Sequence, residues 1–231
     1  MRSLTSPLAS FINHSAVPAI LALSMTGMAW ADISFRTIGG DTAPSGIYYE
    51  MNKQDVPVAA TPDIRSQPYD YNGPSPLVFY TIQKGADGRM NHVPVASIDL
   101  LNAGTYPLFF FFKSPSTSGQ YSIITMKEDA VSFPESTFRI VNFSKCPVEV
   151  TLGKESVKVP AGGSFDKKAA GSTLALGVVA LTQTGPMPVL KNVMPNQQGW
   201  RYLLAVCNTS GGRYPVEVKN LQDAVPAPLP R

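Results

Sequence analysis

Apolar and polar residues alternate in short runs along much of the chain. In "CPVEVTLG", which begins at Cys146, valine and leucine alternate with Glu149 and Thr151. "YPVEVKN" from Tyr214 follows the same pattern, and "YSIITM" from Tyr121 is rich in β-branched residues. A period of two over runs of this length is typical of half-buried β-strands.

Turn-forming residues separate these runs and keep them short. Short turn-forming segments that contain glycine occur at residues 39–41, 85–88, 102–104, 161–163 and 210–212, and the 21 prolines are spread through the chain. Proline ends helices and confines strands to short lengths, and no amphipathic helical pattern of useful length is present. The sequence therefore predicts an all-β protein.

The chain repeats its own pattern once. The matched segments occur in the same order, at an offset of about 103 residues at the start and about 94 thereafter. Two copies of this size predict two tandem immunoglobulin-like β-sandwich units. The matched segments are "SFRTIGG" (Ser34) with "TFRIVNF" (Thr137), "VPVAS" (Val93) with "MPVLK" (Met187), "TYPLFFFF" (Thr105) with "WRYLLAVC" (Trp200), and "GQYSIITMKED" (Gly119) with "GRYPVEVKNLQD" (Gly212).

The repeat sets the expected boundaries. Residues 32–131 form β-sandwich unit one, residues 132–224 form β-sandwich unit two, and residues 225–231 form an extended tail. The segment "AVSFPES", residues 130–136, is the expected link, which Pro134 stiffens. The aromatic core expected for unit one comprises Phe79, Tyr80 and residues 109–112.

Residues 1–31 have the layout of a secretory signal peptide. Arg2 is followed by small and apolar residues from 16 to 28 and by Ala29-Trp30-Ala31, which predicts cleavage before Asp32. The apolar run is too short for a transmembrane anchor, which needs about 20 residues. We therefore expect a periplasmic or secreted protein with no integral membrane segment after cleavage.

Charge narrows the class of partner. The chain has 19 basic and 16 acidic residues, a net charge of +3, and the charges are scattered except for Lys167-Lys168. Nucleic acids and anionic membrane surfaces are recognised by clustered basic residues, so neither is an expected partner. We expect the partner to be an envelope protein or a surface polysaccharide.

The two cysteines, Cys146 and Cys207, both lie in the second half of the chain. An exported protein can keep a disulfide, and a bond between them would tie the start of unit two to its end. The alternative is two buried thiols that act as small apolar side chains.

Catalytic and metal-binding patterns are scarce. His92 is the only histidine after the expected signal peptide, and it lies in "DGRMNHVP", which we interpret as an exposed turn. A catalytic triad would need His92 as its base, and no nucleophile elbow, phosphate-binding loop or zinc spacing occurs. Met90 beside His92 is too small a set for copper. We expect a protein that is not an enzyme and has no cofactor and no metal site, although the sequence alone leaves a pair of catalytic carboxylates open.

One segment is a candidate binding loop. "SQPYDYNGPSP", which begins at Ser66, places Tyr69 and Tyr71 among proline and glycine. Aromatic rings on a loop can stack on sugar faces or anchor a protein partner. The alternative is that both rings fold back and cover the edge of the sandwich.

The segment "FRIVNFSKCPVEVTLGKESVKVPAGGS", from Phe138 to Ser164, resembles short bacterial envelope β-domains. DUF4397-like domains have this order of strand, Val-Asn, turn and strand, and so do the periplasmic accessory proteins of alginate O-acetylation (AlgF), which have two such units behind a signal peptide. The resemblance covers about 60 residues of unit two and less of unit one, and it carries no functional residue. The second domain of periplasmic pilus chaperones has a similar pattern, but the basic pair that anchors their subunits has no counterpart here.

Together these patterns predict an exported, non-catalytic scaffold that contacts a protein or a polymer. The resemblance implies an accessory role in exopolysaccharide assembly or modification as its specific form. The alternative function is a carbohydrate-binding module that uses Tyr69 and Tyr71.

Overall fold

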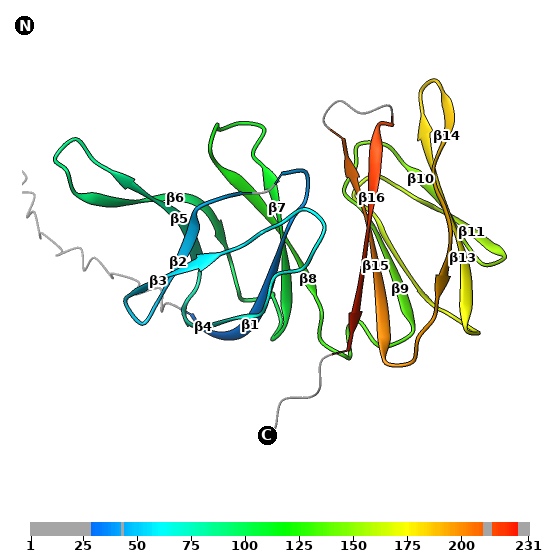
Figure 1. The fold of residues 1–231 in the computed structure, drawn as a ribbon, viewed down its shortest axis with the longest axis horizontal. Coiled ribbons are helices and arrows are strands. Elements are labelled where there is room, and N and C mark those ends of the chain that lie inside the picture. Colours follow the sequence, from blue (N-terminus) through cyan, green and yellow to red (C-terminus); the bar gives the residue numbers. More distant parts are fainter. Residues whose placement is uncertain (1–28, 43, 210–213, 226–231) are drawn as a thin grey trace, which may run out of the picture.

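The computed structural model describes residues 29–42, 44–209 and 214–225. Within these residues the chain is all-β, with sixteen strands in four sheets and no helix (Figure 1). The predicted fold class of tandem β-sandwiches is confirmed. The expected signal peptide falls mostly on residues 1–28 and the expected tail mostly on residues 226–231, and both ranges lie outside the described residues.

Unit one is built from two four-stranded sheets that pack face to face. One sheet has the strand order β4-β1-β7-β8 and the other the order β3-β2-β5-β6. The strands are β1 (Trp30–Gly39), β2 (Ile47–Met51), β3 (Gln54–Val58), β4 (Tyr69–Pro74), β5 (Leu77–Lys84), β6 (Met90–Ile98), β7 (Pro107–Lys113) and β8 (Tyr121–Lys127).

Unit two repeats this plan strand for strand. Its sheets have the orders β12-β9-β15-β16 and β11-β10-β13-β14, which are the orders of unit one with each strand replaced by its counterpart eight places later. The strands are β9 (Thr137–Asn142), β10 (Val148–Leu152), β11 (Glu155–Val159), β12 (Ser164–Lys168), β13 (Thr173–Thr182), β14 (Gly185–Pro195), β15 (Trp200–Asn208) and β16 (Val216–Ala224).

The repeat extends to strand direction and register. The ladder between β1 and β7 is parallel, and so is its counterpart between β9 and β15. Arg36 lies opposite Leu108 in the first of these ladders, and Arg139 lies opposite Leu203 in the second. The two segments that match in sequence, "SFRTIGG" and "TFRIVNF", are therefore equivalent in space.

A β-bulge is also repeated. The β5–β6 register shifts between Phe79 and Tyr80, and the β13–β14 register shifts between Val178 and Val179. A bulge inserts one extra residue on one strand and strengthens the local twist. Its presence at the same place in both hairpins indicates that each unit has the same curvature there.

The four consecutive phenylalanines of β7, residues 109–112, are divided between two cores because successive side chains of a strand point to opposite faces. Phe109 and Phe111 point into the core of unit one, whereas Phe110 and Phe112 point to the opposite face of the sheet. The prediction that all four rings lie in one core was therefore wrong for two of them. Successive side chains of a strand face opposite sides, so a continuous apolar run is buried on both faces.

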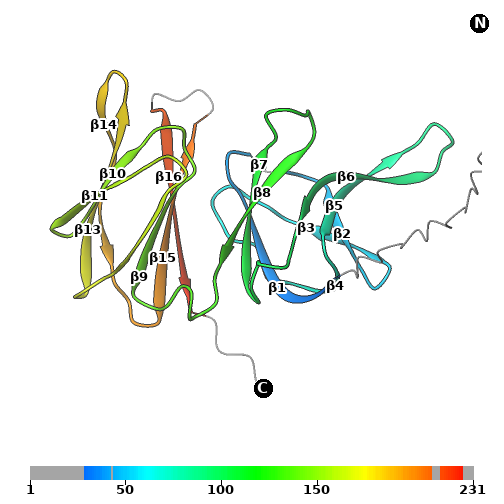
Figure 2. The ribbon, with the colours of Figure 1, turned by 180° about the vertical axis from the view of Figure 1, so that it is seen from behind.

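The second face of β7 packs against unit two. A third apolar cluster, which we call the seam, joins the sheet β4-β1-β7-β8 to the sheet β12-β9-β15-β16, so the molecule is a stack of four sheets (Figures 1 and 2). The buried residues of the seam are Ile38, Leu108, Phe110, Met126, Phe133, Leu203, Ala205, Cys207 and Leu221, with Phe112, Val141 and Phe143 packed against them.

The first strand begins before the expected cleavage site. Trp30 lies opposite Pro74 and Ala31 lies opposite Gly73 in the β1–β4 ladder. Cleavage before Asp32 would remove these two residues and shorten the ladder by two pairs. The rest of the ladder, from Asp32 to Phe35, does not involve them.

Candidate functional site

Tyr69 and Tyr71 lie in β4 and not in the loop that the sequence predicted. Tyr71 is only 5% exposed, and its hydroxyl donates a hydrogen bond of 2.6 Å to the carbonyl of Pro74. The hydroxyl of Tyr69 accepts a hydrogen bond of 2.9 Å from the amide of Ala59, and its ring lies 5.4 Å from that of Phe35. Both rings pack on the core of unit one, so they do not form an exposed surface on which a sugar could stack.

Cys146 and Cys207 are free thiols, and the expected disulfide is absent from the structure. Strand alternation gives the reason. Cys207 follows Leu203 and Ala205 on the face of β15 that forms the seam, whereas Cys146 packs against the inner core of unit two. The two side chains therefore lie on opposite faces of one sheet. Burial raises the pKa of the Cys207 thiol to about 12.

His92 lies in β6 opposite Ile82 and not in a turn. Its ring stacks on that of Tyr80, with centroids 4.1 Å apart, and its Nε2 lies 3.2 Å from the carboxylate of Asp55. The hydroxyl of Tyr80 donates a hydrogen bond of 2.6 Å to the same carboxylate oxygen. Asp55, Tyr80 and His92 therefore form a connected group on the outer face of the sheet β3-β2-β5-β6, which we call the His92 cluster.

Tyr48 extends this cluster along the sheet. Its ring lies 6.5 Å from that of Tyr80, which it faces across the β2–β5 ladder. Burial raises the pKa of the Tyr80 phenol, and the hydrogen bond to the carboxylate of Asp55 raises it further. A phenol held in its neutral form can donate to the carboxylate at any physiological pH. This part of the outer face of unit one is thus polar and aromatic, with one carboxylate at its centre.

A second group of polar side chains lies at the seam. The guanidinium of Arg65 donates two hydrogen bonds, of 3.0 and 2.8 Å, to one carboxylate oxygen of Glu128. Arg201 lies 3.9 Å from the other oxygen of Glu128 and 3.6 Å from the carboxylate of Asp223. Burial lowers the pKa of Arg201, and these two carboxylates oppose that effect.

The link between the units is held by Arg201 and Arg139. The ring of Phe133 contacts both guanidinium groups, with its centroid 4.9 Å from that of Arg201 and 4.4 Å from that of Arg139. Arg201 also donates to the carbonyls of Glu128 and Phe133. The link is therefore fixed by a buried aromatic ring in contact with two cations, in addition to any stiffness that Pro134 contributes.

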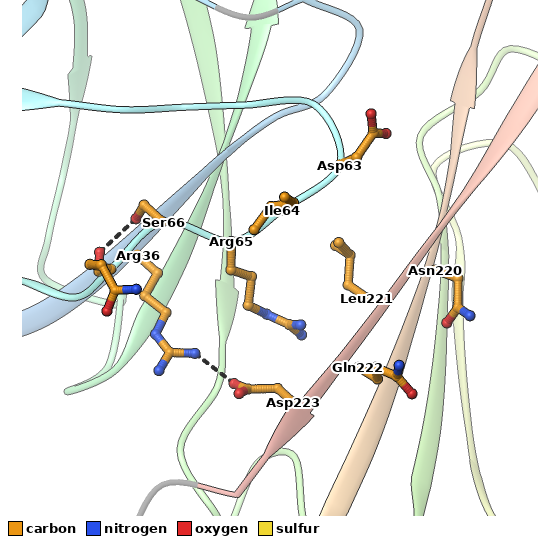
Figure 3. A pocket seen from close by; sticks show the side chains of 10 residues that line it. Arg36, Asp63, Ile64, Arg65, Ser66, Asn220, Leu221, Gln222 and Asp223 are labelled. Atoms are coloured by element: carbon orange, nitrogen blue, oxygen red, sulfur yellow. Dashed lines mark hydrogen bonds and ion pairs between the residues drawn. The ribbon is translucent and has the colours of Figure 1, made fainter. Parts of the chain in front are cut away.

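A cleft of about 390 Å³ opens at the edge of the seam, between the segment from Asp63 to Gln67 and β16 (Figure 3). Arg36 spans it and donates a hydrogen bond of 2.6 Å to Asp223. Both guanidinium groups in the cleft are matched by carboxylates, Arg36 by Asp223 and Arg65 by Glu128. An anionic ligand would have to displace one of these acids, so the cleft is better suited to joining the units than to binding an anion.

The outer face of unit two is a groove of about 600 Å³ over β13 and β14. Ala175, Val179, Pro188 and Val193 line it, and the side chain of Lys191 is its one charged group. Val193 is 63% exposed. We call this surface the unit-two groove.

The unit-two groove and the His92 cluster occupy equivalent positions in the two units. The bulge register makes Val179 the counterpart of Tyr80, since the two lie opposite Pro188 and Pro94 respectively. In unit one this position is Tyr80, whose phenol is hydrogen-bonded to the Asp55 carboxylate, and in unit two it is the apolar side chain of Val179. The same fold thus presents two chemically different outward faces.

The described part of the chain shows no other chemical centre of these kinds. No group of three or more His, Cys, Asp or Glu side chains in residues 29–42, 44–209 and 214–225 is placed to hold a metal ion. None of the same residues forms an apolar helix of membrane-spanning length.

Sequence reasoning missed the His92 cluster and the buried network of Arg201. No local pattern signalled the first, because Asp55, Tyr80 and His92 lie on three different strands that only the sheet brings together. The second had a signal in the sequence, because Arg201 lies between Trp200 and Tyr202 in an otherwise apolar run. A charged residue inside such a run is a candidate for a buried ion pair.

No protein-family model matches the chain, and no curated protein matches it. Among solved structures the chain is similar to the tandem pair of C2-type domains of Extended-Synaptotagmin 2, at 10% identity over 94% of this chain and 96% of that chain, with a TM-score of 0.25. At this level of identity and superposition the similarity supports no functional assignment.

Proposed function

We propose that the protein is an exported, non-catalytic envelope scaffold that holds two contact surfaces at a fixed distance from each other. The observation that carries the proposal is the pair of equivalent outward faces with different chemistry, the His92 cluster and the unit-two groove. A seam that is apolar and ion-paired separates them and fixes their relative position. Accessory work in exopolysaccharide assembly or modification, in the periplasm or outside the cell, is the specific setting that we propose.

The interior of the molecule supports a structural role. The tyrosines that were candidates for sugar stacking are used in the core of unit one, and the arginines at the seam are matched by acids. The surfaces that remain for contact are sheet faces, and an exposed apolar patch on such a face is typical of an interaction site. We therefore do not propose a carbohydrate module based on Tyr69 and Tyr71.

Site-specific photo-crosslinking in the native host tests the proposal. A photoreactive residue is placed at Val78, which is 37% exposed on the outer face of unit one, and a control residue is placed at Val131, which is 92% exposed in the link. We expect a discrete adduct at Val78 and none at Val131. Equal labelling at both positions would contradict a dedicated contact face.

Export is tested separately. Cell fractionation and N-terminal sequencing of the purified protein should give a mature chain that begins at Asp32 and lies outside the cytoplasm. A cytoplasmic protein that retains residues 1–31 would overturn the proposed location. The proposal of two contact faces would then still be tested by the crosslinking experiment.

A further inference from the structure

The unit-two groove is a contiguous apolar surface with no partner in the described chain. Ala175 and Val179 on β13 and Pro188 and Val193 on β14 form its walls. Exposed apolar surfaces of this kind mark interaction sites on soluble proteins. The question is which partner covers it.

Gly177 lies at the floor of the groove, in the middle of β13, opposite Thr151 and Lys191. Glycine in a strand interior weakens the strand and often marks the close approach of another backbone. The backbone here does not require glycine, because a Cβ at this position would meet the Cβ of Thr151 at 3.5 Å, which is an ordinary contact. The missing side chain therefore leaves room above the sheet.

The chain already buries one sheet face against its own equivalent. The seam brings the sheet of β7 against the sheet of β15, and its contacts are reciprocal: Leu108 and Leu203, which occupy equivalent positions, both lie in it. Reciprocal contacts of this kind are those of a two-fold, isologous interface. Face-to-face packing of matching sheets is thus an association that this fold makes.

We propose that the unit-two groove binds the same groove of a second copy of the chain, giving a closed two-fold dimer. If the axis runs parallel to β13, β14 of one copy lies over β10 of the other. Lys191 on β14 then comes within side-chain reach of Glu149 on β10, whose carboxylate accepts a hydrogen bond from Ser156. Neither Lys191 nor Glu149 takes part in an ion pair among the described residues. Two such pairs complete the rim around the apolar centre.

The opposite end of the stack does not offer this match. The equivalent face of unit one carries Asp55, Tyr80 and His92, whose polar atoms bond to one another. Burying that cluster against the apolar groove would desolvate a carboxylate without a new partner. Head-to-tail association is therefore disfavoured, and assembly stops at two copies.

This inference concerns one of the two faces of the proposed scaffold, and it makes that scaffold bivalent. Its test needs only the purified protein, whereas the crosslinking at Val78 needs the native host. Failure of one experiment therefore leaves the other to be judged independently.

Sedimentation equilibrium of the purified mature protein, from about 1 to 200 µM, measures the association directly. We expect a monomer–dimer equilibrium within this range. Val179→Glu places a charge in the apolar centre and should leave only monomer, while Val78→Glu, on the corresponding strand of unit one, should leave the dimer intact. Gly177→Leu fills the floor of the groove and should weaken the dimer about tenfold or more. Thermal unfolding of each variant verifies that it folds.

A charge-reversal cycle tests the orientation. Lys191→Glu should weaken the dimer, and the double change Lys191→Glu with Glu149→Lys should restore it. A protein that is monomeric at every concentration, or a dimer that persists in Val179→Glu and Gly177→Leu, would overturn the proposal. If the dimer of the double variant is no tighter than that of Lys191→Glu alone, a two-fold axis parallel to β13 is ruled out.

Discussion

The guanidinium of Arg36 donates a hydrogen bond of 2.6 Å to the carboxylate of Asp223 and so joins β1 of unit one to β16 of unit two. The reciprocal contact is made by Arg139, the counterpart of Arg36 on β9, which donates to the carbonyl of Lys127 at the end of β8. Each unit thus reaches across the seam with the same residue. The apolar cluster and the buried pair of Arg201 and Glu128 complete the seam.

Arg201→Ala should destabilise the protein strongly. The change leaves the carbonyls of Glu128 and Phe133 without their donor and removes one of the two cations near the Glu128 carboxylate. Breaking a buried charge network of this kind costs about 3 kcal/mol or more. Arg36 is 30% exposed, so Arg36→Ala is the control and should cost about 1 kcal/mol or less. Urea unfolding of both variants measures the difference, and equal effects would contradict the buried role of Arg201.

Phe133→Ala should loosen the link between the units. The side chain is fully buried, and its removal costs about 3–5 kcal/mol of packing in addition to both cation–π contacts. Limited proteolysis should then cut the chain between Glu128 and Ser136 faster than in the parent protein. Val131→Ala changes an exposed residue of the same segment and should leave the cleavage rate unchanged.

Tyr71→Ala should lower stability and not a binding affinity. The ring is buried in the core of unit one, so its loss is expected to cost about 3–5 kcal/mol. Tyr69→Phe removes only the hydroxyl that accepts from the amide of Ala59, and about 1 kcal/mol is expected. Thermal unfolding measures both. A fully stable Tyr71→Ala protein would show that the ring is not part of the core.

The two thiols should react at different rates and should not pair. Cys207 is fully buried in the seam, and burial raises its pKa to about 12, so little thiolate exists at neutral pH. Cys146 is partly exposed and should be alkylated first. Mass spectrometry of the native protein after iodoacetamide treatment should show one label, at Cys146. An oxidised protein with an intact Cys146–Cys207 bond would contradict this placement.

Stability should fall between pH 10 and pH 12. Burial raises the pKa of Tyr49 from 10.0 to about 12, with the charge of Asp70 adding to the effect, and burial also raises the pKa of Tyr71. A raised pKa means that the folded state holds its proton more tightly than the unfolded state does. The resulting stability is complete below the unfolded value of 10.0 and is lost as the pH rises through the folded value.

Urea unfolding at several alkaline pH values, followed together with phenolate absorbance, checks this expectation. Tyr49→Phe removes one of the ionising groups and should make the dependence on pH shallower. A slope that the substitution leaves unchanged would mean that Tyr49 ionises equally well in the folded protein.

The sequence predicted the fold class and the repeat because both follow from local periodicity. The alternation around Val148 and Val150 specifies strands, and the resemblance between the segments of Arg36 and Arg139 reflects equivalent ladders. The register of the last match was off by two residues. The ladders make Met126 and Leu221 equivalent, whereas matching Gly119 with Gly212 pairs Met126 with Lys219. A two-residue shift keeps every side chain on its own face, so the pattern could not detect it.

The candidate site could not be predicted in the same way, because it depends on which face of a sheet is covered. Tyr69 and Tyr71 stand in a segment rich in proline and glycine, yet pairing with β1 makes it a strand. Cys146 and Cys207 both belong to unit two, which suggested a bond between them. Cys207 lies on the face of β15 that forms the seam, however, whereas Cys146 packs on the opposite side of that sheet. Whether a sheet has one buried face or two depends on the tertiary structure. Phe110 and Phe112 are covered only because unit two packs against the second face of their sheet.

The seam joins two halves that belong to one polypeptide, so their docking is a unimolecular step. Two separate sandwiches with the same complementary faces would come apart on dilution, because their association would depend on concentration. A tether this short instead holds the partners at an effective concentration in the millimolar range or above. The distance between the two outward faces therefore does not depend on protein concentration. A single molecule in dilute solution holds its two contact surfaces as far apart as a molecule at high concentration does.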